Sequence, residues 1–202
     1  MSLSILEKVH GENHPDVVQL LNNLAILLYS QGNYVAAAPC YSRLLKIEEI
    51  ILPPNHPDIA STLNTLAVIY YIQKRYTEAE PLYRRSLEIY EKNFGTNHLD
   101  VATSLNNLAE LYDAQGRFRE AEQFYKKSLA IRESLLPSNH PDIAASLNNL
   151  AVLYCSLGLH AMALPLYSRA VLIVEKANGL DHTTTKLYRQ NLKLCKDAMR
   201  TI

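Results

Sequence analysis

The segment LNNLAELYDAQGRFREAEQFYKKSLAIRE, residues 105–133, indicates the fold of this chain, because its pattern returns at a fixed distance along the sequence. Equivalent segments lie 42 residues apart, and no insertion or deletion interrupts four of them. The repeated positions include a leucine, two alanines and a tyrosine: Leu24, Leu66, Leu108 and Leu150; Ala25, Ala67, Ala109 and Ala151; Ala37, Ala79, Ala121 and Ala163; Tyr41, Tyr83, Tyr125 and Tyr167. Such a period indicates a repeat architecture in which each unit buries its apolar face against its neighbours. Leu24 and Tyr41, with their equivalents, are predicted to fill the space beside the alanines.

Each unit is predicted to form two helices. In the quoted unit, Leu105, Leu108 and Leu111 recur at helical spacing, which predicts a first helix from about Leu99 to Gln115. Glycine is the expected residue after a helix end, so Gly116 and its equivalents are predicted to stop this helix, with Lys74 as the exception. The second helix is predicted to end near residues 135–137.

A histidine precedes each first helix, in tripeptides such as His14-Pro15-Asp16. The equivalent histidines are His56, His98, His140 and, in a decayed form of the motif, His182. Proline suits the first helical position and aspartate suits the positive end of a helix, so these tripeptides are predicted to mark helix starts.

We therefore expect an all-α solenoid, arranged as a single array over residues 1–202. Complete units are predicted at 13–54, 55–96, 97–138 and 139–180. Residues 1–12 align with the end of a second helix and are predicted to be the remnant of a preceding hairpin. Residues 181–202 are predicted to form a C-terminal capping helix, because Arg189 and Lys193 stand where earlier units have Leu and Ala.

The quoted unit resembles the tetratricopeptide (TPR) consensus at Leu108-Ala109, Tyr112, Gly116, Phe118, Ala121 and Tyr125. The usual unit has about 34 residues, and the 42-residue form is similar to the repeats of kinesin light chains and nephrocystin-3. This resemblance implies a right-handed superhelical solenoid of tetratricopeptide helix-turn-helix hairpins. It also implies a non-catalytic scaffold or adaptor that binds an extended peptide segment of a partner protein in a concave groove lined by first helices. Such a protein would act as a kinesin-light-chain-like cargo or complex adaptor.

Transferred position by position, the resemblance implies these groove residues: Asn22, Asn23, Ile26, Tyr29, Asn64, Val68, Tyr71, Asn106, Asn107, Glu110, Asp113, Asn148, Asn149 and Val152. Asparagine is a mediocre helix former, so its recurrence favours a role for the amide. The amides are expected either to hold the backbone of a ligand or to hydrogen-bond the neighbouring hairpin and keep the repeats in register. Thr65 replaces the second asparagine in one unit.

The chemistry of these positions bears on the kind of ligand. A clamp for a terminal carboxylate resembles a groove lined with Lys and Arg, but the corresponding positions hold Gln19, Ser61, Thr103 and Ala145. Glu110 and Asp113 also argue against the acidic cargo peptides of kinesin light chains. We expect apolar or aromatic ligand anchors that dock on Tyr29, Tyr71, Ile26 and Val68.

Composition excludes several other functions. The 20 basic and 20 acidic residues balance, so no overall charge favours nucleic acid. Arg84, Arg85, Lys126 and Lys127 are expected to pair with nearby glutamates at i,i+4 spacing on a solvated outer face. No apolar run approaches the roughly 20 residues that span a bilayer, and the N-terminus does not resemble a secretory signal. A cytoplasmic protein without membrane insertion is expected.

The titratable residues predict no catalytic, metal or cofactor site. Cys40, Cys155 and Cys195 are odd in number and widely spaced, which argues against a disulfide framework and against zinc. The repeated histidines are expected about 10 Å apart, too far to share one ion. Phosphate-binding and nucleophile motifs are missing from the sequence.

Two alternatives to the scaffold function stay open. The array is also compatible with a regulatory or sensor region of a larger multidomain protein linked to an ATPase or a protease. The other alternative is a self-assembling structural array, in which copies associate through the exposed N-terminal half-hairpin.

Overall fold

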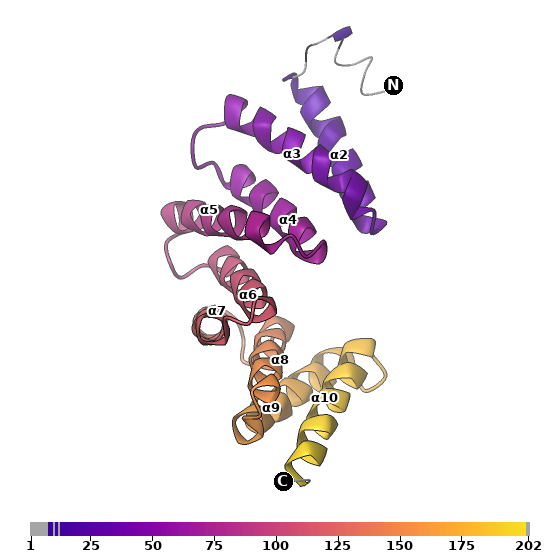
Figure 1. The fold of residues 1–202 in the computed structure, drawn as a ribbon, viewed down its shortest axis with the longest axis vertical. Coiled ribbons are helices and arrows are strands. Elements are labelled where there is room, and N and C mark those ends of the chain that lie inside the picture. The colour runs from indigo at the N-terminus through magenta and orange to yellow at the C-terminus, as the bar shows by residue number, and fades with distance from the viewer. Residues whose placement is uncertain (1–7, 10, 12, 201–202) are drawn as a thin grey trace. The chain divides into compact units, whose positions relative to one another are not determined.

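The computed structural model describes residues 8–9, 11 and 13–200, and this part of the chain contains nine helices (Figure 1). They are α2 (Pro15–Ser30), α3 (Tyr34–Ile51), α4 (Pro57–Ile72), α5 (Tyr76–Phe94), α6 (Leu99–Ala114), α7 (Phe118–Leu135), α8 (Pro141–Ser156), α9 (His160–Asn178) and α10 (Thr183–Arg200). The all-helical, TPR-like solenoid expected from the sequence is confirmed. The predicted helical remnant at 1–12, and self-association through it, fall largely outside the described residues.

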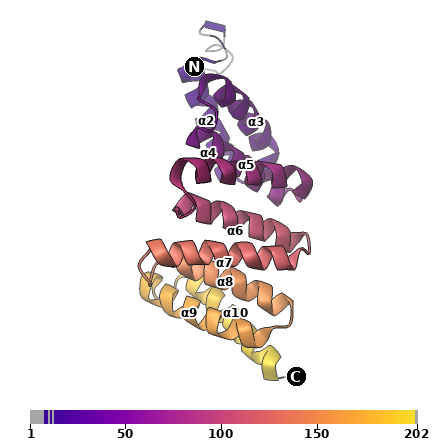
Figure 2. The same ribbon diagram turned by 90° about the vertical axis from the view of Figure 1, so that its left-hand side faces the viewer.

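The contacts divide the chain into two compact units, Met1–Thr96 and Asn97–Ile202. The first unit contains α2 to α5 and the second contains α6 to α10. Within each unit, every helix packs on the next one along the chain, as Figure 2 shows for α7, α8, α9 and α10. Among the described helices, none combines the length and the apolar character needed to cross a membrane.

The histidines begin the first helices, as predicted. Nδ1 of His14 accepts a hydrogen bond from the backbone N–H of Asp16 at 3.3 Å, and the same cap recurs at His56, His98 and His140. His182 keeps this bond to the N–H of Thr184 at 3.2 Å, although the rest of its motif has decayed. A side-chain acceptor at this position satisfies one of the N–H groups that a helix start leaves free.

The first helices also end where the sequence predicts. Gly116 adopts a φ of 75° directly after α6, and Gly32 and Gly158 adopt similar values. Lys74 takes the equivalent place after α4 with a φ of 61°, a left-handed conformation that a residue with a Cβ atom rarely adopts. The turn therefore imposes its backbone geometry even where the sequence does not supply glycine.

Small residues let the two helices of each hairpin approach closely. Ala25 and Ala37, together with their equivalents in the other three repeats, are completely buried. The repeated tyrosines fill the space beside them and are also buried. Leu24 differs from its buried equivalents, because 37% of its surface is exposed. The prediction that it fills the core beside the alanines is therefore wrong for this first repeat.

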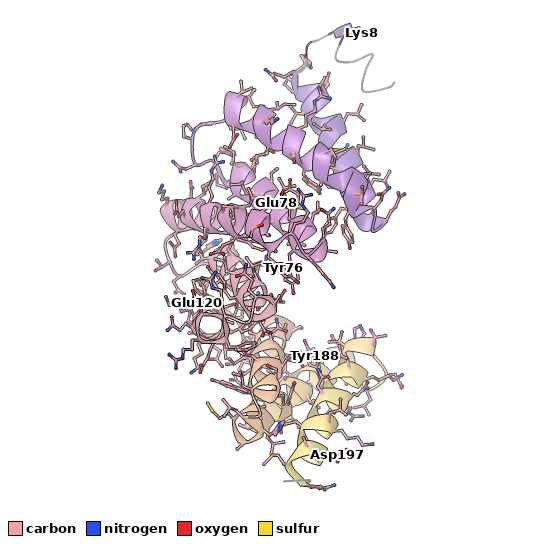
Figure 3. All side chains as sticks on the ribbon, in the orientation of Figure 1. Lys8, Tyr76, Glu78, Glu120, Tyr188 and Asp197 are labelled. Atoms are coloured by element: carbon pink, nitrogen blue, oxygen red, sulfur yellow. The ribbon has the colours of Figure 1, made fainter. Side chains whose placement is uncertain are left out.

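The last helix, α10, packs on α9 and also contacts α8. Tyr188, labelled in Figure 3, lies in a buried cluster with Ile143 and Ala170. Arg189 and Lys193 of α10 are exposed, as predicted from their polar character, and Arg189 pairs with Glu175 of α9 at 2.6 Å. Assignment of α10 as a cap remains a prediction.

The outer face is only partly as expected. Arg84 and Lys126 do pair with Glu80 and Glu122 at i,i+4 spacing. Arg85 instead pairs with Glu49 of α3, and Lys127 lies over the ring of Phe124 at 5.7 Å. The i,i+4 prediction is wrong for these two residues, because neither has a glutamate four positions away.

Candidate functional site

A pocket of about 600 Å³ opens between α2, α3 and α4 in the first unit, and we call it the α2–α4 pocket. Asn22, Asn23 and Ile26 line it from α2, and Ser61 and Thr65 line it from α4. Its floor is formed by three buried residues of α3: Tyr41, Leu44 and Glu48. Three of the residues predicted for the groove therefore meet around one hollow, which places polar amides beside an apolar surface.

Glu48 gives the floor of this pocket an unusual carboxyl group. Only 8% of its surface is exposed, and burial raises its pKa from an ordinary 4.5 to about 7. A hydrogen bond to Thr62 opposes this rise in pKa, whereas the negative charges of Asp58 and Glu49 add to it. Oε2 of Glu48 is buried without a hydrogen-bond partner among the described residues. The floor therefore holds a buried carboxyl oxygen that no described residue satisfies.

In the second unit, the predicted asparagines form a network between neighbouring repeats. The amide nitrogen of Asn149 donates to Oδ1 of Asn106 at 3.2 Å and to the Glu110 carboxylate at 3.0 Å. Asn106 also donates to Glu110 at 2.9 Å. One repeat further on, Asn191 of α10 donates to Asn148 at 3.0 Å. These bonds support the alternative in which the amides hold the repeats in register.

Below this network lies a buried arginine. Arg132 of α7 donates to Oγ of Ser146 at 2.6 Å and to the backbone oxygen of Asp142 at 3.3 Å. Burial raises the pKa of Glu110 and lowers that of Arg132, while the charge of Arg132 and the bonds from Asn106 and Asn149 favour ionised Glu110. Arg132 occupies the repeat position of Glu48, so this position carries opposite charges in the two units.

The remaining predicted groove residues are not gathered at either place. Tyr29 packs edge-on against Tyr34 with ring centroids 5.5 Å apart, and Tyr71 packs against Tyr76 at 5.8 Å. Five further residues are partly buried or exposed on the first helices: Asn64 and Val68 on α4, Asn107 and Asp113 on α6, and Val152 on α8. Burial raises the pKa of Asp113. The rings of Tyr29 and Tyr71 therefore pack against tyrosines of their own hairpins.

Two features of the structure were missed by reasoning from the sequence. One is the pair of charged residues at an otherwise variable repeat position, Glu48 and Arg132. The other is a cluster of Cys155, His160 and Cys195, whose possible ligand atoms all lie within 4.8 Å of one another. A column-by-column comparison of the repeats could have detected both, because in each case a chemically distinctive residue replaces an ordinary one.

Comparisons with known proteins agree with this architecture. The chain resembles the crystal structure of BtubC (BKLC) from P. vanneervenii at 25% identity, with a TM-score of 0.81, over 98% of this chain and 80% of that one. It also resembles a kinesin-light-chain-like protein of Podosopora anserina with nearly identical TPR-like repeats, at 25% identity and a TM-score of 0.77, over 93% of this chain and 89% of that one.

The apo form of RapI shares the fold, with a TM-score of 0.78 at 15% identity, over 91% of this chain and 64% of that one. No curated protein sequence matches the chain. The family model for the tetratricopeptide repeat matches residues 1–49, 58–134 and 142–200. With its paired helices, buried alanines and 42-residue period, the chain belongs to the tetratricopeptide repeat family.

Proposed function

We propose that this protein is a non-catalytic scaffold that binds an extended peptide segment of a partner protein, and that the α2–α4 pocket is part of the binding site. The family commonly serves protein interaction, and its fold is usually non-catalytic. The observation that carries the proposal is the pocket itself, because it places the amides of Asn22 and Asn23 beside the exposed side chain of Ile26.

The first unit differs from the second in a way that favours ligand binding. In the second unit, Asn149 donates to the asparagine of the preceding repeat, Asn106. The residue equivalent to Asn149 in α4 is Thr65, whose hydroxyl donates to the backbone oxygen of Ser61 at 3.0 Å instead. Asn22 therefore receives no amide donor from that position, and its amide is available to a peptide backbone.

The lining of the pocket indicates which peptide would bind. Ile26 and Ile51 offer apolar surface, with 49% and 43% of their areas exposed. Glu48 and Asp58 offer carboxyl groups, and the pocket contains no basic residue. A peptide with an apolar anchor next to a hydrogen-bond donor or a basic side chain would complement this lining, whereas an acidic peptide would be repelled.

A peptide-display selection on the intact chain, followed by calorimetry of an enriched peptide, tests the proposal. Replacing both Asn22 and Asn23 by alanine should weaken binding by about tenfold or more, because each lost hydrogen bond contributes about 1 kcal/mol. The matched control is Asn139→Ala/Asn178→Ala, which changes two exposed asparagines outside the pocket. Unchanged affinity in the pocket variant, or no enrichment of any peptide, would refute the assignment.

A further inference from the structure

Three helices of the second unit bring two thiols and an imidazole together. Cys155 lies near the end of α8, His160 is the first residue of α9, and Cys195 lies in α10. One possible ligand atom from each side chain lies within 4.8 Å of the other two. Cys195 is 2% exposed, and Cys155 and His160 are partly buried. The cluster lies where α10 packs on the last hairpin, a region in which α8, α9 and α10 run together in Figure 2.

The hydrogen bonds of the described residues leave one nitrogen of the imidazole in this cluster unsatisfied. Nδ1 of His160 is buried and has no hydrogen-bond partner among the described residues. The Cys195 thiol makes a weak contact to the backbone oxygen of His160 at 3.7 Å and also interacts with the Cys155 side chain. Burial raises the pKa of the Tyr167 hydroxyl, and Cys155 lies close enough to that side chain to raise it further. A buried imidazole nitrogen without a partner is costly, so its presence beside two thiols needs another explanation.

The repeats themselves provide the comparison. The residues 126 positions earlier than these three are Tyr29, Tyr34 and Ile69. In the first unit these residues belong to one apolar cluster, in which the two tyrosine rings pack edge to face. The same place in the architecture is therefore filled by ordinary packing groups in the first repeat and by three metal-binding groups in the last. Packing alone does not require this joint replacement.

We propose that Cys155, His160 and Cys195 form a zinc site that fastens α10 to the last hairpin. Thiolate and imidazole are the preferred ligands of Zn²⁺, at about 2.3 and 2.0 Å, so the ligand atoms of a tetrahedral site lie about 3.5–3.8 Å apart. The separations of up to 4.8 Å require only a small contraction. Binding releases the two thiol protons to solvent. The fourth position is left to water or to an external ligand, as in sites with three protein ligands.

The hydroxyl of Tyr167 supports this arrangement as a positioning group. It lies next to Cys155 and would orient that sulfur, in the way that groups outside a metal's own ligands usually do. The repeat position of Tyr167 is a buried tyrosine throughout the array. The position of Cys155 holds a cysteine in the last repeat alone, because the equivalent residues of the earlier repeats are Tyr29, Tyr71 and Asp113.

The test is titration of the reduced, metal-free full chain with Co²⁺, followed by displacement with Zn²⁺. We expect one equivalent of Co²⁺ to produce a thiolate charge-transfer band and the visible bands of a tetrahedral site, and Zn²⁺ to abolish both. Cys155→Ser and Cys195→Ser should each weaken binding by more than about 100-fold, beyond the loss of a group that merely orients a ligand. Cys40→Ser is the matched control, since Cys40 lies in α3 of the other unit, and it should bind as the wild type does.

A second measurement keeps the test valid if a variant folds less well. Zn²⁺ should raise the Tm of the wild type and of Cys40→Ser, because the assembled site binds it more tightly than the unfolded chain does. It should leave the Tm of His160→Gln unchanged. Failure of the reduced wild type to bind Co²⁺ or Zn²⁺ overturns the proposal, as does undiminished binding by both serine variants. Isolation of a Cys155–Cys195 disulfide whose reduced form binds no metal would likewise overturn it and assign the cluster to thiol oxidation.

Discussion

Replacing Glu48 by glutamine should stabilise the protein at neutral and alkaline pH. The folded protein binds the Glu48 proton more tightly than the unfolded chain does, because the pKa rises from 4.5 to about 7 on burial. The stabilising contribution of the protonated form is therefore complete below the unfolded pKa and is lost as the pH rises through about 7. Glutamine keeps the shape of the protonated side chain and can still bond to Thr62, but it never ionises.

The pKa difference sets the size of the effect. Each pKa unit corresponds to about 1.4 kcal/mol, so a rise from 4.5 to about 7 makes the ionised carboxylate cost about 3 kcal/mol when fully deprotonated. Between pH 5 and pH 8 the linkage relation attributes to Glu48 a fall of about 2.5 kcal/mol in the free energy of unfolding. This portion of the wild-type pH dependence should disappear in Glu48→Gln.

Urea unfolding followed by circular dichroism at pH 5 and pH 8 measures the difference. Comparing the variant with the wild type removes the contributions of other titrating groups. Glu88→Gln, an exposed glutamate on α5, is the matched control and should follow the wild-type pH dependence. If Glu48→Gln unfolds with the same pH dependence as the wild type, Glu48 is ionised at little cost in the folded protein, and the argument from its burial is refuted.

Two further predictions concern the turns and the amide network. Lys74→Gly should raise the free energy of unfolding by about 1 kcal/mol, because glycine adopts the left-handed φ of 61° without strain. The reverse change, Gly116→Lys, should lower it by a similar amount in the same urea assay. Variants as stable as the wild type would contradict the argument. Asn149→Ala should lower the free energy of unfolding by about 1–3 kcal/mol, because Glu110 and Asn106 lose a buried donor. Asn139→Ala should leave stability near that of the wild type, and an equally small effect at Asn149 would exclude the network as a source of stability.

Most of the secondary structure was predictable because its causes are local. The histidine caps act through a hydrogen bond spanning two residues, and a turn after each first helix needs a left-handed residue whatever surrounds it. The alanines were predictable as helix contacts because the fixed period places them alike in every repeat. Leu24 was predicted incorrectly because its exposure depends on what lies beside the first repeat, which the repeat pattern does not describe.

The candidate site was predictable only as a set of positions. The resemblance to kinesin light chains named Asn22, Asn23 and Ile26, which line the α2–α4 pocket, but it treated Asn106 and Asn149 as equivalent to them. The amides of the second unit instead bond to each other across neighbouring repeats. This difference arises from a single replacement, Thr65, whose short side chain turns to its own backbone rather than to the preceding helix.

The period, the helices, their starts and ends, and most of the residues that pack between them could be predicted from the sequence, because each depends on spacing along the chain. The polar groups that meet could be identified only from the folded structure. Glu48 acquires its raised pKa from burial against α4. Cys155, His160 and Cys195 come together because α10 folds back onto the hairpin of α8 and α9. Such encounters depend on distances between separate helices, which no local pattern encodes.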